Sequence, residues 1–234
     1  EAGNGDRVAY YFEGEPGDSR AVTYAELTDE VKRLANVLTD LGVGQGDRVA
    51  IYLPMIPEAI ASMLAVARLG AIHSVVFGGF SADSLRSRID DAGAKVVITA
   101  DGGYRKGRVS PLKPAVDQAL ADRGNGTQAT VEKVLVVKRG GNDVEWTAGS
   151  DVWWHDMEVN VRGVFTTMRD VVPAMVARGS GCVVVMGSGM GRFPSPWTSA
   201  YGASKAAAAH LVSSTAQELV GTGVAVFAIS PGMV

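Results

Sequence analysis

The first two thirds of the chain alternate between two hydrophobic patterns. Apolar residues three or four positions apart predict helices, and short apolar runs bounded by turn residues predict strands. The clearest helix spans residues 23–42, where Thr23 is a candidate N-cap and Gly42 a candidate C-terminal stop. Further helices are predicted at 57–70, 81–93 and 111–124, and strands at 47–54, 71–78, 94–101 and 131–139. This alternation predicts an α/β fold, in which helical crossovers connect the strands of a parallel sheet.

The last third continues the alternation but differs in composition. Helices are predicted at 158–179 and 201–223, and strands at 181–188 and 224–232. Residues 1–156 hold 39 charged side chains, whereas residues 157–234 hold eight. Such a drop in charge density predicts two parts, 1–156 and 157–234. No linker separates them, and DVWWHDMEVN (151–160) looks like the entry to a helix.

Composition excludes several classes of protein. The net charge of −3 gives no case for nucleic acid or an anionic membrane as partner. No apolar run reaches the roughly 18 residues of a membrane span, and the histidines lie near no cluster with metal-ligand spacing, so we expect no metal site. The one cysteine, Cys182, lies in an apolar run. We therefore expect a buried thiol, no disulfide framework and a cytoplasmic setting.

One glycine-rich stretch has the wrong context for a phosphate loop. Gly42, Gly44 and Gly46 follow a helix and precede a strand. A loop that holds phosphate through free backbone N–H groups has to follow a strand and open a helix. We therefore expect a structural turn here.

Two other stretches are open to a ligand interpretation. Gly78 and Gly79 follow a strand and precede a helix, and on spacing alone an anion loop and a plain turn are equally good interpretations. The segment 104–113 carries four cations on what we expect to be a loop. These cations could hold phosphate oxygens, although a solvated loop is the commoner explanation.

Several stretches of residues 1–156 carry a family resemblance, among them GVGQGDRVAIYLPMIPEA, HSVVFGGFSADSLRSRIDDAGAKVVITADGGYRKGR and NDVEWTAGSDVWWHD. They resemble the acetyl-coenzyme A synthetase family of AMP-forming acyl ligases, whose cofactors are coenzyme A and ATP. The resemblance implies that Arg105 and Arg108 contact coenzyme A phosphates, and that Gly78 and Gly79 lie beside the same cofactor. The family's Ser/Thr/Gly-rich phosphate loop and its later adenylate motifs are not found in the chain, so we expect acetyl-adenylate formation to be lost.

The last third carries a different chemistry. Tyr201 and Lys205 lie four residues apart on one helix, where a lysine ammonium stabilises a phenolate and lets the phenol act as a general acid or base. Ser188 ends an apolar strand, from which its hydroxyl could bond a substrate oxygen. Asn160, near the start of the preceding helix, could hold a water.

These residues, with the stretches EVNVRGVF, SAYGASKAA and VAVFAISPGMV, resemble the short-chain dehydrogenase/reductase family. The resemblance implies that Ser188, Tyr201, Lys205 and Asn160 form the catalytic set of an NAD- or NADP-dependent oxidoreductase. Pro231 and Gly232 would approach the nicotinamide. The family's N-terminal glycine loop, its ribose selector and its N-N-A-G motif are not found.

The two resemblances together predict a chimera of two fragments, joined inside the shared residues Trp153–Asp156 and cut at both outer ends. We expect an incomplete ligase lobe joined to an incomplete Rossmann-type half, with neither activity complete. Two alternatives stay open: a non-catalytic remnant that binds coenzyme A, and a working NAD(P)-dependent oxidoreductase. Helices without their usual partners would expose apolar surface, so we also expect self-association.

Overall fold

The computed structural model describes residues 3–121, 130–188 and 199–230. The chain divides into two compact units, Glu1–Trp154 and His155–Val234. The division falls at the first turn of helix α5 (Trp154–Arg178), two residues before the boundary expected at residue 156. Within the described part of the chain, no helix combines the length and the apolar character that crossing a membrane requires.

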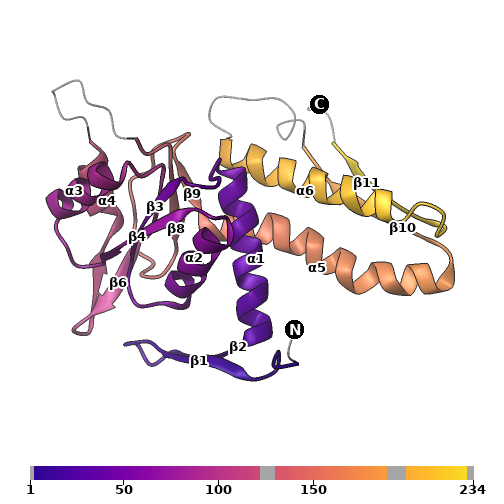
Figure 1. The fold of residues 1–234 in the computed structure, drawn as a ribbon, viewed down its shortest axis with the longest axis horizontal. Coiled ribbons are helices and arrows are strands. Elements are labelled where there is room, and N and C mark those ends of the chain that lie inside the picture. Colours follow the sequence, from indigo (N-terminus) through magenta and orange to yellow (C-terminus); the bar gives the residue numbers. More distant parts are fainter. Residues whose placement is uncertain (1–2, 122–129, 189–198, 231–234) are drawn as a thin grey trace. The chain divides into compact units, whose positions relative to one another are not determined.

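A five-stranded parallel sheet forms the centre of the first unit (Figure 1). Its strands follow the order β4-β3-β5-β8-β9, and each neighbouring pair is parallel. The strands are β3 (Arg48–Leu53), β4 (Ile72–Phe77), β5 (Val96–Ala100), β8 (Lys133–Val137) and β9 (Asp151–Trp153). The predicted α/β fold with a parallel sheet is thus confirmed for this unit.

Helices cover both faces of this sheet. Helix α1 packs against α2 on one face, and α3 packs against α4 on the other (Figure 1). Their bounds are α1 (Tyr24–Asp40), α2 (Pro57–Arg68), α3 (Ala82–Ala92) and α4 (Lys113–Leu120). Thr23 caps α1 as predicted, in a reciprocal capping box with Glu26. The helix ends at the C-cap Leu41, one residue before the predicted stop at Gly42.

The sequence patterns missed three pieces of sheet. An antiparallel hairpin pairs β1 (Val8–Glu13) with β2 (Ser19–Thr23), and a second one pairs β6 (Gly102–Arg105) with β7 (Arg108–Pro111). The third piece is β9, which joins the edge of the main sheet immediately before α5. Strands β6 and β7 have four residues each and β9 has three, so local periodicity gives little sign of them. Strands β1 and β2, with six and five residues, are as long as strands of the main sheet and were missed all the same.

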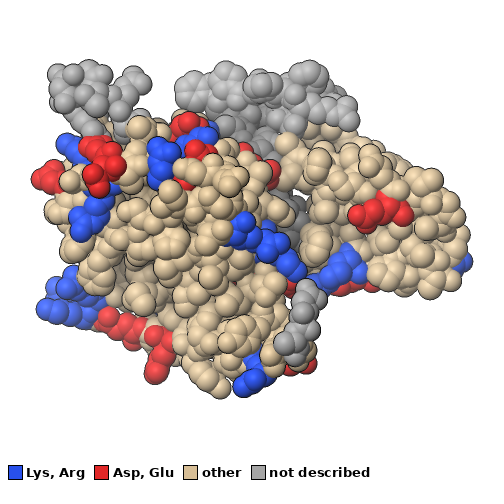
Figure 2. All heavy atoms as spheres, in the orientation of Figure 1, with Lys and Arg blue, Asp and Glu red and all other residues tan. Residues whose placement is uncertain are grey.

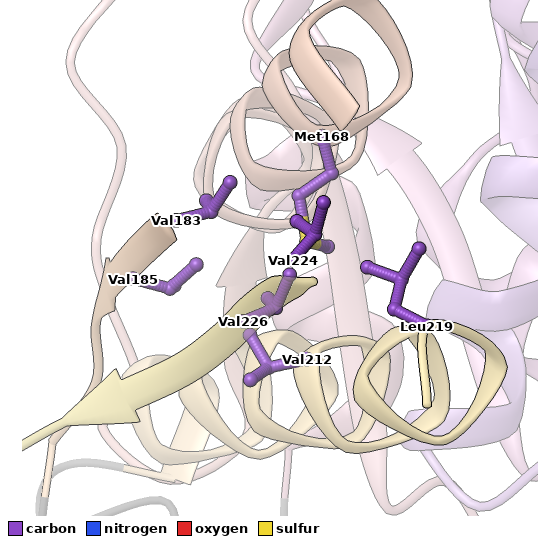
Figure 3. Close-up of a cluster of buried hydrophobic side chains, with 7 residues drawn as sticks. All are labelled: Met168, Val183, Val185, Val212, Leu219, Val224 and Val226. Atoms are coloured by element: carbon purple, nitrogen blue, oxygen red, sulfur yellow. The ribbon is translucent and has the colours of Figure 1, made fainter. Parts of the chain in front are cut away.

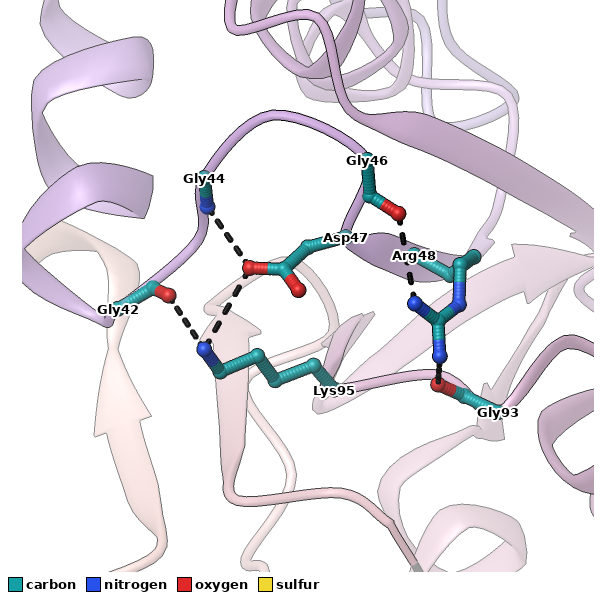
Figure 4. A network of polar contacts seen from close by, with 7 residues as sticks. All are labelled: Gly42, Gly44, Gly46, Asp47, Arg48, Gly93 and Lys95. Carbon is teal, nitrogen blue, oxygen red and sulfur yellow. Dashed lines mark hydrogen bonds and ion pairs between the residues drawn. The ribbon is translucent and has the colours of Figure 1, made fainter.

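The glycine turn between α1 and β3 is structural, as predicted (Figure 4). The Gly44 N–H donates to Asp47 Oδ2 at 2.8 Å, a bond that is the main cause of an Asp47 pKa below its usual value. Lys95 Nζ lies 2.6 Å from the Gly42 carbonyl and 3.4 Å from Asp47 Oδ2. The Gly44 N–H is thus engaged within the protein, and a carboxylate occupies the place where a phosphate would have to approach.

In the described residues of the second unit, a two-stranded parallel sheet packs with two long helices. Its strands are β10 (Gly181–Met186) and β11 (Val224–Ile229), and its second helix is α6 (Ser199–Glu218). Side chains from both helices and both strands form one apolar cluster (Figure 3). The members of the cluster are Met168, Val183, Val185, Val212, Leu219, Val224 and Val226. The two helices therefore pack on the same face of the strand pair.

The other face of β10 and β11 corrects the prediction of a buried thiol. Cys182 is exposed, as are Val184, Met186, Phe227 and Ile229 on the same face. A fully apolar strand sequence is typical of a sheet covered on both faces. Here the described helices cover one face only, so alternate residues of β10 remain exposed.

Candidate functional site

The topology of the first unit marks one edge of the sheet as a ligand site. From β3 the chain crosses by α2 to β4 on one side, whereas the later crossovers lead to β5 and β8 on the other side. In open parallel sheets, ligands bind outside the carboxyl ends of the strands where the order reverses. The segments that leave these strand ends start at Pro54, Gly78 and Asp101.

The backbones of these segments approach each other closely. A Cβ added at Gly78 would lie 2.9 Å from the carbonyl oxygen of Leu53, and one added at Gly103 would lie 2.9 Å from the Pro54 Cβ. Distances below 3 Å are too short for a side chain, so glycine is needed at both positions. The first role of Gly78 is therefore to bring the β4 loop against the end of β3.

Gly79 and Arg105, predicted separately to bind the same cofactor, lie side by side. A Cβ added at Gly79 would lie 3.0 Å from Arg105 Nη1 and 3.1 Å from the Phe77 ring. The bare backbone of Gly79 thus leaves room for the guanidinium. The loop after β4 and the hairpin that follows β5 are therefore neighbours at this point.

The cationic segment is a hairpin turn and not the loop that the sequence suggested. Arg105 and Arg108 face each other in register at the end of β6 and β7, with Lys106 and Gly107 between them. We call residues Arg105–Arg108 the arginine turn. The signal that was missed is the two-residue connection ending in glycine, which is typical of tight hairpins. The pairing gathers three of the four cations of this segment at one end of the hairpin; the fourth, Lys113, begins helix α4 and is buried.

A surface hollow of about 500 Å³ opens at this turn. Its lining comprises Arg105, Lys106, Arg108, Val109, Ser110 and Pro111. In Figure 2, blue side chains gather where Figure 1 has this hairpin, with red ones next to them. Arginine guanidinium groups present planar sets of donors that match phosphate oxygens, so this surface is suited to a phosphate-bearing ligand.

Asp101 supports the base of this hairpin and was missed from the sequence. It is fully buried, and its Oδ1 accepts the N–H groups of Gly102 at 2.7 Å, Arg139 at 2.7 Å and Gly140 at 2.8 Å. Its Oδ2 accepts the Gly141 N–H at 2.7 Å. One carboxylate thereby ties β5, the start of β6 and the segment after β8 together. The available signal was an acid placed directly after a buried apolar strand and before two glycines.

In the second unit, the structure describes part of the predicted catalytic set. Lys205 Nζ donates to the Met186 carbonyl at 3.2 Å, at the end of β10, and Ser188 follows two residues later. Met186 and Lys205 also line a hollow of about 290 Å³. Lysine and serine are thus brought to the same end of β10. The side chains of Asn160 and Tyr201, and residues Pro231 and Gly232, lie outside the described part of the chain.

Comparisons with known proteins identify the chain's family. The family model described as "AMP-binding enzyme" matches residues 1–189, past the boundary expected at residue 156. The acetyl-coenzyme A synthetase of Streptomyces avermitilis is 69% identical over 157 residues, which are 67% of this chain and 23% of that protein. That of Mycolicibacterium smegmatis is 64% identical over 157 residues, 67% of this chain and 16% of its own. That of Methanothrix thermoacetophila is 56% identical over 153 residues, 65% of this chain and 22% of its own.

The chain therefore spans about a quarter or less of the length of these relatives. The family match covers well over half of the chain, including the whole parallel sheet of the first unit, Gly78, Gly79 and the arginine turn. The chain belongs to the AMP-binding enzyme family.

Proposed function

We propose that the first unit is the coenzyme A-binding part of an acetate–CoA ligase. In the proposal, Arg105 and Arg108 bind phosphate oxygens of coenzyme A, and the backbone at Gly78 and Gly79 lies against the same cofactor. The observation that carries it is the position of the Arg105 guanidinium beside Gly79 at the carboxyl edge of the sheet, where a Cβ added at Gly79 would lie 3.0 Å from Arg105 Nη1. The acetyl-coenzyme A synthetases to which the chain is similar support this choice of ligand.

The proposal assigns binding, and not acetate activation, to these residues. The complete reaction joins acetate to coenzyme A at the expense of ATP. Bound coenzyme A would supply the thiol that accepts the acetyl group, and the residues of this chain would hold its phosphates. The Ser/Thr/Gly-rich loop that binds ATP phosphates in such ligases is not found in the sequence, so we propose that the chain is inactive by itself.

Replacement of Arg105 by Ala should weaken coenzyme A binding about 10- to 100-fold, because charge-assisted hydrogen bonds contribute about 1.5–3 kcal/mol each. Calorimetric titration of the full chain with coenzyme A measures this. Arg68→Ala is the matched control, because Arg68 is an exposed arginine at the end of α2, on the opposite edge of the sheet. Equal affinity of the Arg105→Ala variant and the unchanged chain would rule the proposed site out.

We propose further that the second unit derives from a short-chain dehydrogenase/reductase and has lost its nucleotide site. The observation that favours this origin is the bond from Lys205 to the end of β10 beside Ser188, on a parallel strand pair with two flanking helices. The origin implies a join of two gene fragments near Trp153–Asp156, which sequencing of the source DNA across these codons would show as a discontinuity.

NADPH fluorescence is expected to stay unchanged when the chain is added, because no strand-to-helix glycine fingerprint is found to hold the pyrophosphate. The alternative of a working oxidoreductase predicts quenching or enhancement that saturates. The Lys205→Met variant is the control for any change seen, since a specific nicotinamide site at α6 requires its response to differ from that of the unchanged chain.

A further inference from the structure

The N-terminal hairpin β1–β2 contacts the arginine turn from a position about ninety residues earlier in the chain. The Gly107 N–H donates to Glu15 Oε1, on the connection between β1 and β2. Figure 1 shows the β1–β2 connection next to the β6–β7 hairpin, and Figure 2 shows acidic side chains next to the basic ones there. An acid beside a cationic site opposes anion binding by charge alone, so this contact calls for another explanation.

The backbone of the arginine turn needs support of this kind. Lys106 has φ 53°, and it is the one non-glycine residue of the described chain with positive φ; Gly107 follows with φ 73°. An L residue adopts this left-handed conformation at a cost, and asparagine or glycine is the usual choice in such a turn. A strained turn persists when surrounding contacts hold it, and the bond to Glu15 is one such contact.

A second contact reaches the same hairpin beside the turn, at Tyr104. Arg139 forms a two-point ion pair with Asp18, at 2.7 Å and 2.9 Å, and this pairing is the main cause of an Asp18 pKa below its usual value. The Arg139 guanidinium also lies 5.3 Å from the ring centroid of Tyr104, in β6, and 5.7 Å from that of Phe12, in β1. Arg139 therefore joins the two hairpins through both its charge and its flat faces.

We propose that Glu15 and Asp18 are positioning residues for the arginine turn. Glu15 holds the turn through Gly107, and Asp18 holds Arg139 against Tyr104, so that Arg105 and Arg108 face the phosphates in a fixed arrangement. This inference rests on the proposed binding of coenzyme A at the arginine turn. It assigns to the β1–β2 hairpin a role in shaping a site that its side chains need not touch.

A purely electrostatic role and a positioning role of Glu15 predict opposite effects of its replacement on coenzyme A affinity. Removal of an acid beside a cationic site strengthens anion binding if charge alone matters. If Glu15 positions the turn, Glu15→Ala instead weakens coenzyme A binding, by roughly fivefold. Glu15→Gln keeps an oxygen that accepts the Gly107 N–H while it removes the charge, so its affinity should equal or exceed that of the unchanged chain.

The experiment is calorimetric titration of the full chain and its variants with coenzyme A. Glu13→Ala is the matched control: Glu13 lies on the same hairpin, and within the described residues its side chain shows no bond to β6 or β7. We expect weaker binding for Glu15→Ala, recovery for Glu15→Gln, and no weakening for Glu13→Ala. Tighter binding by Glu15→Ala, or equal affinities of Glu15→Ala and Glu15→Gln, would overturn the proposal.

Trypsin cleavage separates this inference from the proposed function. The arginine turn offers cleavage sites after Arg105, Lys106 and Arg108, and cleavage needs the turn to open. Glu15→Ala and Asp18→Asn should each speed cleavage there severalfold, whereas Glu15→Gln should not. If the chain binds no coenzyme A, the proposed function fails, and the cleavage rates still decide whether Glu15 and Asp18 hold the turn. Unchanged rates in both variants would overturn the positioning role.

Discussion

Replacement of Lys113 by Met is expected to lower the free energy of unfolding by about 3–5 kcal/mol, because it breaks a buried ion pair on one side only. The Lys113 side chain has no exposed surface, and Nζ lies 2.8 Å from Asp151 Oδ2, whose side chain is 2% exposed. Nζ also contacts Asp117. The variant leaves the Asp151 carboxylate buried without its cation, at the start of β9.

The effect of this substitution should depend on pH. Burial is the main cause of an Asp117 pKa above its usual 3.8, and the contact with Lys113 lowers that pKa. Without Lys113, the pKa of the Asp117 carboxyl in the folded chain rises further above its value in the unfolded chain. A raised carboxyl pKa favours folding when the group is protonated, and this benefit is lost as the pH rises through the folded value. The loss of unfolding free energy caused by Lys113→Met should therefore be largest at pH 7 and become smaller toward pH 4.

Urea unfolding at pH 7 and pH 4.5, followed by circular dichroism, measures both results. Lys32→Met is the matched control, since Lys32 and Asp29 form an exposed pair at 3.9 Å, with side chains 54% and 49% exposed. Such pairs contribute about 0–1 kcal/mol. The double variant Lys113→Met with Asp151→Leu should recover much of the loss, because it removes the stranded charge as well. A loss for Lys113→Met no larger than that of the control would contradict the buried-pair account.

Asp101→Asn is expected to cost about 2–4 kcal/mol, since hydrogen bonds to a charged group contribute about 1.5–3 kcal/mol and a donor left without an acceptor costs more. The carboxylate accepts four backbone N–H groups through two oxygens. An amide keeps one oxygen and places an NH₂ group against at least one of these donors. We also expect weaker coenzyme A binding, because Asp101 anchors both the start of β6 and Arg139.

The same urea titration tests Asp101→Asn, with Asp143→Asn as control. Asp143 is exposed and lies two residues beyond the segment that Asp101 holds. We expect the control to stay within about 0.5 kcal/mol of the unchanged chain, as is usual for exposed positions. If the two variants unfolded at the same urea concentration, the four-donor arrangement would not stabilise the fold as described.

Helix caps and turns that depend on a few adjacent residues could be predicted from the sequence. Thr23 caps helix α1, as its hydroxyl before the apolar periodicity suggested, and the helix predicted at 81–93 begins at the cap Ser81. The order of helix and strand also indicated that Gly44 belongs to a structural turn, because a phosphate loop needs the opposite order. In each case a few adjacent residues determine the backbone, so a short stretch of sequence is enough.

Predictions from the sequence were wrong or missing where a residue's burial or pairing depends on segments elsewhere in the chain. Cys182 was expected to be buried because its neighbours are apolar, but burial depends on whether a second layer covers that face. The strand β9 forms by pairing with β8, about seventeen residues earlier. A strand of three residues has no periodicity from which it could be predicted.

In the candidate site, too, residues in local motifs could be predicted, and residues that act through distant contacts could not. Local motifs and a resemblance pointed to Gly78, Gly79, Arg105 and Arg108, and the structure places the Arg105 guanidinium beside Gly79. The residues that support them, Glu15, Asp101 and Arg139, were missed. Each acts through bonds to segments far away in the sequence, and such bonds leave no local pattern.

Backbone amide NMR during a coenzyme A titration tests phosphate binding by the arginine turn, because it shows where the ligand binds and not only that it binds. We expect the amide signals of Gly78, Gly79 and residues 105–108 to shift and saturate together, whereas those of β10 and β11 stay in place. Pantetheine, which carries no phosphate, should shift the arginine-turn signals far less. Saturating shifts that spare residues 105–108, or an equal response to pantetheine, would contradict phosphate binding by the arginine turn.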